Sequence, residues 1–348
     1  MGHPFIENTT PFLFEPLPLT DEQMRPVFTL VVKATFALRP GKEPVLASEQ
    51  VPLYLAGQRW KGSDTASYQY EPEVAFIKPA TDVVLVGHAH APRVGTRELL
   101  VSLRVGPVKK GVQVFGDRTW VRGLGGVRMT QPVAFETLPL QYERAFGGWD
   151  RSHPEPARHQ FEPRNPVGTG FRARHGRFEE GLRLPNLEDP LDCLREWGQT
   201  PAPTGFGFLS PEWQPRASLA GTYDARWDQT RKPYLPKDFD RRFFNAASPG
   251  LVASGYLRGD EPVTLVHASA AGRLEFQLPG LSPPRVRAAR FRQEDSEVTL
   301  NLDTVIIDAD AMHLLLIWRG LLPLRRDPTE VSALLVTQEG SERLARME

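Results

Sequence analysis

Phe28-Thr-Leu-Val-Val-Lys-Ala-Thr-Phe-Ala-Leu38 is the stretch of sequence that decides the fold class. An apolar residue stands at every second position from Phe28 to Leu38. Side chains of a β-strand point alternately to the two faces of a sheet, so this spacing lines one face with apolar groups. Pro40-Gly41 then ends the run with a turn. The stretch therefore predicts a long strand whose apolar face packs on a core.

Strand-like runs separated by turn residues recur in two zones, residues 1–140 and 256–348. Lys109-Lys-Gly111 is expected to be a hairpin tip. Two more hairpins are expected, formed by residues 263–267 with 273–278 and by residues 304–307 with 313–318. No helical segments alternate with these runs, and no fixed-period repeat is visible. We predict a mainly β fold whose antiparallel sheets pack as a sandwich or as two β subdomains, with the C-terminal zone forming one unit with the N-terminal zone.

The central zone, residues 141–255, is rich in Gly and Pro and poor in apolar periodicity, yet it carries many aromatic residues. A flexible linker would be poor in aromatic residues, so we expect long ordered loops held by aromatic anchors. One short helix is predicted from Asp189-Pro190, where Pro would occupy the first helical position, to Gly198.

Composition restricts the function classes. The chain has 348 residues, 42 of them Lys or Arg and 42 Asp or Glu, so its formal net charge is zero. This balance disfavours nucleic-acid binding. Its single cysteine, Cys193, can form neither an internal disulfide nor a thiolate zinc site. The N-terminus lacks the features of a signal peptide, and the strongly apolar stretch at His313–Trp318 is far shorter than a membrane helix. We therefore expect a cytoplasmic protein without membrane insertion.

No specific catalytic or cofactor-binding motif occurs, and we predict no cofactor. His88 and His90 would lie on one face of a strand and could supply two metal ligands, but two hydrogen-bonded histidines are the favoured interpretation. Asp308, Asp310 and His313 could hold a cation or move a proton. Their place between two apolar runs favours a turn.

Residues 238–242 place two carboxylates beside two guanidinium groups, a pattern typical of an ion-paired lattice that holds a loop. Aromatic and Arg side chains are the usual anchors of protein interfaces. The candidate partner-binding residues are Trp149, Tyr223, Trp227, Tyr234, Phe239, Arg241 and Arg242. These aromatic residues could equally form a small core of their own. A carbohydrate-binding module or a hydrolase is the alternative function, with Asp224, Asp228, Asp238 and Asp240 as its acids.

Several segments together resemble one bacterial family, the domain of unknown function numbered 2169, over about residues 5–320. The segments that carry the resemblance are Ala145–Gly148, Asn165–Gly168, Leu184–Leu187, Pro203–Gly207, Gly221–Trp227, Pro233–Asp240, Arg242–Ala247 and Leu257–Glu261, with Asn8–Phe12 and Val31–Phe36 near the N-terminus. The resemblance implies an accessory role in bacterial type VI secretion. The protein would be a non-catalytic adaptor or chaperone that binds a toxin effector and assists its loading onto the spike protein. The resemblance implies no catalytic residues.

Overall fold

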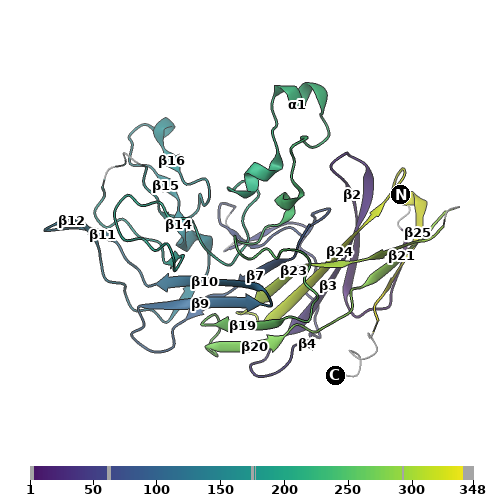
Figure 1. Cartoon of the computed structure of the whole chain (residues 1–348), viewed down its shortest axis with the longest axis horizontal. Helices are drawn as coiled ribbons and strands as arrows, with labels where there is room; N and C mark the ends of the chain where they lie inside the picture. Colours follow the sequence, from purple (N-terminus) through teal and green to yellow (C-terminus); the bar gives the residue numbers. More distant parts are fainter. Residues whose placement is uncertain (1–3, 61–63, 174–175, 177, 292–293, 340–348) are drawn as a thin grey trace.

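A computed structural model describes residues 4–60, 64–173, 176, 178–291 and 294–339. Most of its regular structure is β, arranged in three larger sheets and several two-stranded pairs (Figure 1). This confirms the prediction of a mainly β fold with antiparallel sheets and sandwich-like packing. Each larger sheet combines strands from distant parts of the chain. No helix among the described residues is long and apolar enough to cross a bilayer.

The largest sheet contains the predicted strand, here β3 (Pro26–Ala37). The sheet has the order β2-β3-β24-β23-β7, with β2 (Leu13–Thr20), β24 (His313–Pro323), β23 (Asn301–Asp308), β7 (Asp82–Val86), and β4 (Val45–Leu46) paired to β3. The interior of β3 is buried on both faces, not on one as the alternation predicted. The sequence reasoning also missed that β23 and β7 pair in parallel, which brings Asp308 beside Val86.

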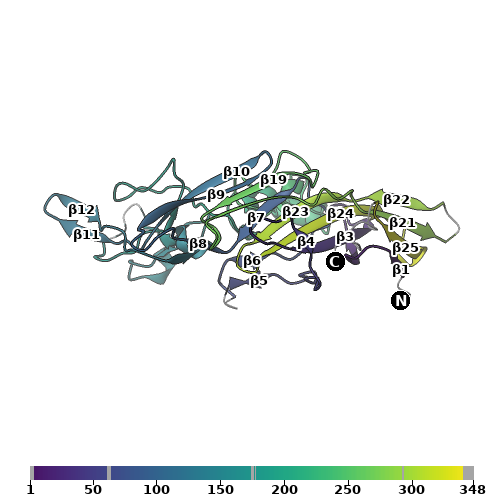
Figure 2. The ribbon, with the colours of Figure 1, turned by 90° about the horizontal axis from the view of Figure 1, so that it is seen from below.

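A second sheet has the order β18-β10-β9-β19-β20, with β18 (Leu187–Glu188), β10 (Val108–Phe115), β9 (Glu98–Val105), β19 (Pro262–Val266) and β20 (Arg273–Gln277). The third has the order β1-β25-β21-β22, with β1 (Phe5–Asn8), β25 (Val331–Thr337), β21 (Arg285–Arg290) and β22 (Ser296–Thr299). The molecule is long and flat, and the third sheet lies at one end of it (Figure 2).

Short pairs and single turns complete the fold. The pairs join β5 (Gln58–Arg59) with β6 (Tyr68–Tyr70), β8 (His88–His90) with β13 (Thr137–Pro139), β11 (Trp120–Gly123) with β12 (Gly126–Met129), β14 (Phe146–Gly147) with β17 (Thr169–Gly170), and β15 (Trp149–Asp150) with β16 (Gln160–Phe161). The 3-10 turns are η2 (Tyr142–Arg144), η3 (Pro156–Arg158), η4 (Arg216–Ala220), η5 (Arg241–Phe244) and η6 (Pro328–Glu330). The single α-helix of the described residues is α1 (Ala225–Thr230).

Two local predictions are wrong. No helix follows Asp189-Pro190: the Asp189 carboxylate accepts the N–H of Leu191 in a tight turn, and the chain does not continue as a helix. Lys109–Gly111 lies inside β10, because the β9–β10 hairpin turns earlier, at residues 106–107. Gly106 has a φ of 52°, a conformation that glycine adopts without strain. The two C-terminal hairpins are confirmed.

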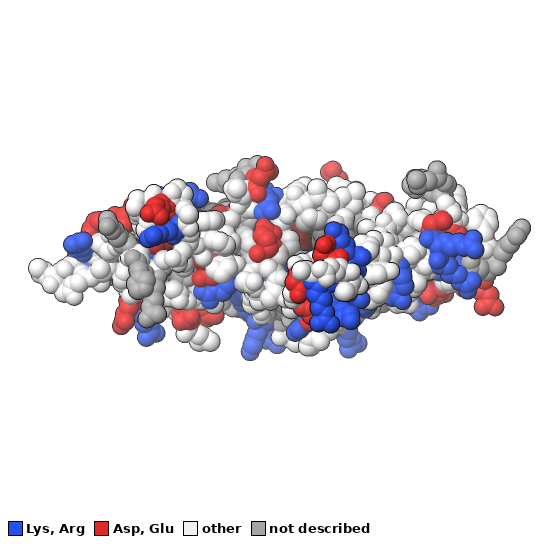
Figure 3. All heavy atoms as spheres, turned by 90° about the horizontal axis from the view of Figure 1, so that it is seen from above, with Lys and Arg blue, Asp and Glu red and all other residues white. Residues whose placement is uncertain are grey.

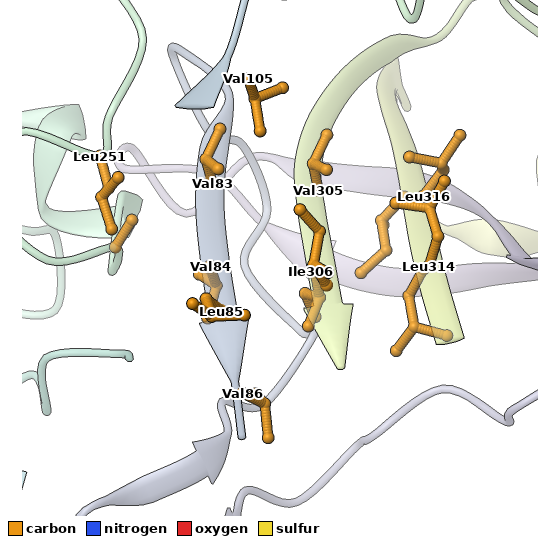
Figure 4. Close-up of a cluster of buried hydrophobic side chains, with 14 of the residues drawn as sticks. Val83, Val84, Leu85, Val86, Val105, Leu251, Val305, Ile306, Leu314 and Leu316 are labelled. Atoms are coloured by element: carbon orange, nitrogen blue, oxygen red, sulfur yellow. The ribbon is translucent and has the colours of Figure 1, made fainter. Parts of the chain in front are cut away.

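One large buried cluster contains residues of all three larger sheets. Val83 of β7 lies beside Val105 of β9, and Val305 and Leu316 of the largest sheet belong to the same buried cluster (Figure 4). Leu251, from the central zone, packs against the other side of β7. Phe206, Phe208 and Trp213 of the central zone belong to the same cluster, so the central loops are part of the core.

Charged side chains are buried between the largest sheet and the loops around it. On β3, Lys33 is fully buried, and its Nζ lies 2.8 and 3.0 Å from the two carboxylate oxygens of Glu73. Arg319 pairs with Asp303 at 2.5 Å in the same way. Burial without a partner would cost each ion several kcal/mol, so each charge requires its partner.

Candidate functional site

An arm, defined here as residues 221–240, projects from the body of the molecule and carries α1 at its tip (Figure 1). The Asp224 carboxylate accepts the N–H of Trp227 at 2.8 Å and caps the helix. At the base, the Asp238 carboxylate accepts the N–H and the hydroxyl of Thr222 at 3.1 and 2.7 Å. Gly221 has a φ of 82°, and a Cβ there would lie 2.7 Å from that of Pro236, so the close approach of the two legs requires glycine. The two legs of the arm are therefore held together at its base by hydrogen bonds and close packing.

Aromatic side chains cover the tip of the arm. Tyr223 is 52% exposed and Tyr234 is 42% exposed. Trp227 holds both in place: its ring meets that of Tyr223 edge-on at 4.7 Å, and its Nε1 donates to the carbonyl of Tyr234 at 2.8 Å. The Arg231 guanidinium lies 5.8 Å from the centre of the Tyr234 ring. The structure thus brings three of the predicted partner-binding residues together on one exposed element.

Phe239, Arg241 and Arg242 lie at the base of the arm. Phe239 packs against Phe243 and Phe244 of η5, with ring centres 5.9 and 5.6 Å apart, and so anchors the arm. Arg241 pairs with Glu22 in the turn between β2 and β3.

The carboxylates at the base are held in their charged form. Asp240 pairs with Arg242 at 2.5 Å, as the expected ion-paired lattice requires. Hydrogen bonds from Arg242 lower the pKa of Asp240, and hydrogen bonds from Thr222 lower the pKa of Asp238. Neither group is disposed to act as a general acid near neutral pH.

Buried charges fasten the base of the arm to the largest sheet. The Asp82 carboxylate, on β7, accepts Lys78 Nζ at 2.8 Å, the N–H of Ala246 at 2.9 Å and Nδ2 of Asn245 at 2.9 Å. Arg216 of η4 pairs with Glu71 and donates to the carbonyl of Phe243 at 2.7 Å. Both legs of the arm therefore begin from buried polar anchors.

Trp149 lies apart from the arm, on β15 (Figure 1). It is 42% exposed, stacks on Phe161 at 4.7 Å, and has the Arg151 guanidinium 5.5 Å from its ring. Hollows of about 730 and 690 Å³ share Trp149, Arg151, Pro166 and Val167 in their lining. This exposed aromatic between two hollows can receive apolar side chains of a ligand.

Two glycine-containing segments, residues 145–148 and 165–168, contribute residues to the lining of these hollows. Asn165 is fully buried, and its Nδ2 donates to the carbonyls of Tyr142 and Phe146 at 2.7 and 3.0 Å. A Cβ on Gly147, where φ is 149°, would overlap the carbonyl of Asn165. A Cβ on Gly168 would lie 2.7 Å from the carbonyl of Ala145. The segments interlock through their backbones, and only glycine leaves room for this.

A family model described as an uncharacterized protein conserved in bacteria, DUF2169, matches residues 23–319. This chain belongs to the DUF2169 family. No curated protein and no solved structure matches it. Much of the resemblance to DUF2169 was carried by residues that now prove to be structural anchors, such as Gly147, Asn165 and Asn245.

The two histidines on β8 are brought close to an acid that the sequence analysis did not connect with them. His88 Nδ1 lies 2.8 Å from a carboxylate oxygen of Asp310, and burial lowers the pKa of His90. Asp308 accepts the N–H groups of Asp310 and Ala311, which confirms the predicted turn. Within the described ranges, no group of three His, Cys, Asp or Glu side chains could hold a metal ion.

The Ser248 hydroxyl contacts a lysine and a tyrosine, as a catalytic nucleophile could, but a substrate cannot reach it because it is buried. Its hydroxyl lies 2.6 Å from Lys110 Nζ and 2.8 Å from the hydroxyl of Tyr142. Burial lowers the pKa of Lys110 to about 8. Ser248 is fully buried and lines neither of the hollows beside Trp149, so this cluster holds the loop after η5 onto β10.

Proposed function

We propose that this protein is a cytoplasmic, non-catalytic adaptor or chaperone of type VI secretion, which binds a toxin effector and assists its loading onto the spike. Two observations support the proposal. The chain belongs to the DUF2169 family, and its resemblance to that family implies this role. Aromatic side chains that are about half exposed lie on a projecting element, an arrangement typical of a protein interface.

The exposed aromatic cluster of Tyr223 and Tyr234 is the observation on which the proposal rests. Tyr side chains supply large amphipathic contact area and lose few rotamers on binding. Both residues remain about half exposed although Trp227 contacts each of them.

The alternative, a carbohydrate-binding module or hydrolase, has less support from the same residues. A hydrolase needs two carboxylates facing each other across a cleft. On the arm, all four acids already have a partner within the arm or at its base. Asp224 caps the helix, Asp228 pairs with Lys232, Asp238 binds Thr222, and Asp240 binds Arg242.

A pull-down with purified protein tests the proposal. The effector and spike proteins encoded beside the gene are the prey, and the immobilised wild-type chain is the bait. We expect capture of at least one of them, and loss of capture by Tyr223→Ala/Tyr234→Ala. Phe291→Ala is the matched control, because Phe291 is 64% exposed and directly follows β21 of the third sheet. Absence of capture by folded wild-type protein would contradict the proposal.

A further inference from the structure

On the arm, the acidic side chains have partners, whereas several basic side chains form no ion pair. Residues 221–240 contain four basic and four acidic side chains, so the arm as a whole is formally neutral. All four acids have partners: Asp224 caps the helix, Asp228 pairs with Lys232 at 3.0 Å, Asp238 accepts from Thr222 and Asp240 pairs with Arg242. Arg226 and Lys237 are exposed and form no ion pair with any residue that the structure describes.

Arg231 adds a third cation that lacks a carboxylate partner among the described residues. Its Nε donates to the carbonyl of Leu235 at 2.5 Å, and its guanidinium lies over Tyr234. Viewed from above, Lys and Arg side chains lie near the middle of the face, where the arm projects, with acidic side chains among them (Figure 3).

We infer that the tip of the arm binds an acidic, extended polypeptide segment of a partner protein, with Tyr223 and Tyr234 receiving its apolar side chains and Arg226, Arg231 and Lys237 its carboxylates. The inference rests on the proposed adaptor function and specifies the chemistry of the partner. Unpaired cations attract carboxylates, and their arrangement beside exposed tyrosines combines an apolar anchor with a charged rim. An acidic peptide would meet little repulsion, since both acids of the tip already have partners.

Charge reversal on the arm tests this inference directly. The probe is a short fluorescein-labelled peptide in which glutamate alternates with leucine and phenylalanine, compared with versions carrying glutamine or lysine in place of glutamate. Fluorescence anisotropy at low and at physiological salt gives the affinities. We expect the glutamate peptide to bind about tenfold more tightly than the glutamine peptide at low salt, and the advantage to shrink as salt rises.

The arm variant is Arg226→Glu/Lys237→Glu. Position 226 is in the first turn of α1, where an acidic residue is favourable, so the helix should persist; circular dichroism checks this. We expect this variant to bind the glutamate peptide about tenfold or more weakly, because each lost ion pair is replaced by repulsion. The control Arg93→Glu/Arg97→Glu makes the same change in charge at two exposed cations far along the chain from the arm, and we expect it to keep wild-type affinity.

Four outcomes of the peptide experiment would overturn the inference: no saturable binding of the glutamate peptide, equal affinity for the glutamine peptide, equal loss in the control variant, or tighter binding of a single-stranded oligothymidylate than of the peptide. The proposed function fails separately. If the effector or spike is captured equally by wild type and arm variant, the inference is wrong and the adaptor function stands. If neither protein is captured by wild type, the adaptor function is wrong, and the peptide experiment still decides the chemistry of the arm.

Discussion

Asp82→Asn is the substitution that best tests how the arm is anchored. Asp82 is fully buried on β7 and accepts hydrogen bonds from Lys78, Asn245 and Ala246. Asparagine has nearly the same shape but carries no charge. Lys78, whose side chain is 5% exposed, would lose the carboxylate that lies 2.8 Å from its Nζ. The amide would also present an N–H₂ group to donors that now meet an oxygen.

The magnitude follows from the burial of the pair. Removing one partner of a buried ion pair costs about 3–5 kcal/mol, because the other charge remains buried and uncompensated. Glu71 and Asp303 also attract Lys78 and help to raise its pKa, so part of its charge stays balanced. We therefore expect the lower end, a loss of about 3 kcal/mol in the free energy of unfolding, which for a protein of this size is a fall in Tm of about 6 °C.

Urea unfolding followed by tryptophan fluorescence measures the loss, and limited proteolysis measures whether the arm is released. Lys78→Met removes the other charge, and Lys78→Met/Asp82→Asn removes both. We expect the double variant to be more stable than the sum of the single losses predicts, by about 1–3 kcal/mol. A loss below about 1 kcal/mol for Asp82→Asn, or strictly additive losses, would refute the claim that this pair anchors the arm.

Three other predictions concern separate features. Gly147→Ala should destabilise the protein by about 3 kcal/mol, because the new Cβ would overlap the carbonyl of Asn165; urea unfolding checks this, and a stable variant with unchanged fluorescence would contradict it. The pKa of Lys110 is about 8 in the folded protein, below its value in the unfolded chain, so above pH 8 the unfolded chain binds more protons. The free energy of unfolding of wild type, relative to that of Lys110→Met, should therefore rise by about 1–2 kcal/mol between about pH 7.5 and about pH 9.5. A difference in urea midpoints that does not change with pH would refute this prediction. Asp224→Ala should weaken α1 by about 1 kcal/mol, seen as faster amide exchange at Trp227 with an unchanged global urea midpoint.

The strands and two local hairpins were predictable, and the pairing of strands far apart in the chain was not. Alternation in residues 28–38 predicted β3 because local side-chain spacing follows from backbone geometry. The parallel contact of β7 with β23 joins residues far apart along the chain, as in Val86 and Asp308, and no local pattern encodes it. That same contact places Asp310 beside His88, which explains why the acid partner of this histidine was missed.

The exposed part of the candidate site could be predicted, and its anchors could not. Tyr223, Trp227 and Tyr234 were identified because aromatic residues in a segment poor in aliphatic residues must either pack or bind. Phe239 met the same criterion but packs against η5, since sequence alone does not distinguish the tip of an arm from its base. The sequence signal for the anchors was a charged residue, Asp82, at the start of an apolar strand.

The buried charges at the base of the arm are better explained by the orientation that they give the arm than by a gain in stability. Apolar residues of similar volume would stabilise such a contact as well or better, because burying ions is costly. Apolar contact, however, is not directional. The Asp82 carboxylate receives donors from Lys78, Asn245 and Ala246 at 2.8–2.9 Å. Because hydrogen bonds are directional, these contacts fix where the returning leg of the arm meets the sheet. An arm that binds a partner through a few exposed side chains loses less entropy when its orientation is already set. The cost of burying these ions is therefore consistent with a surface whose orientation matters for binding.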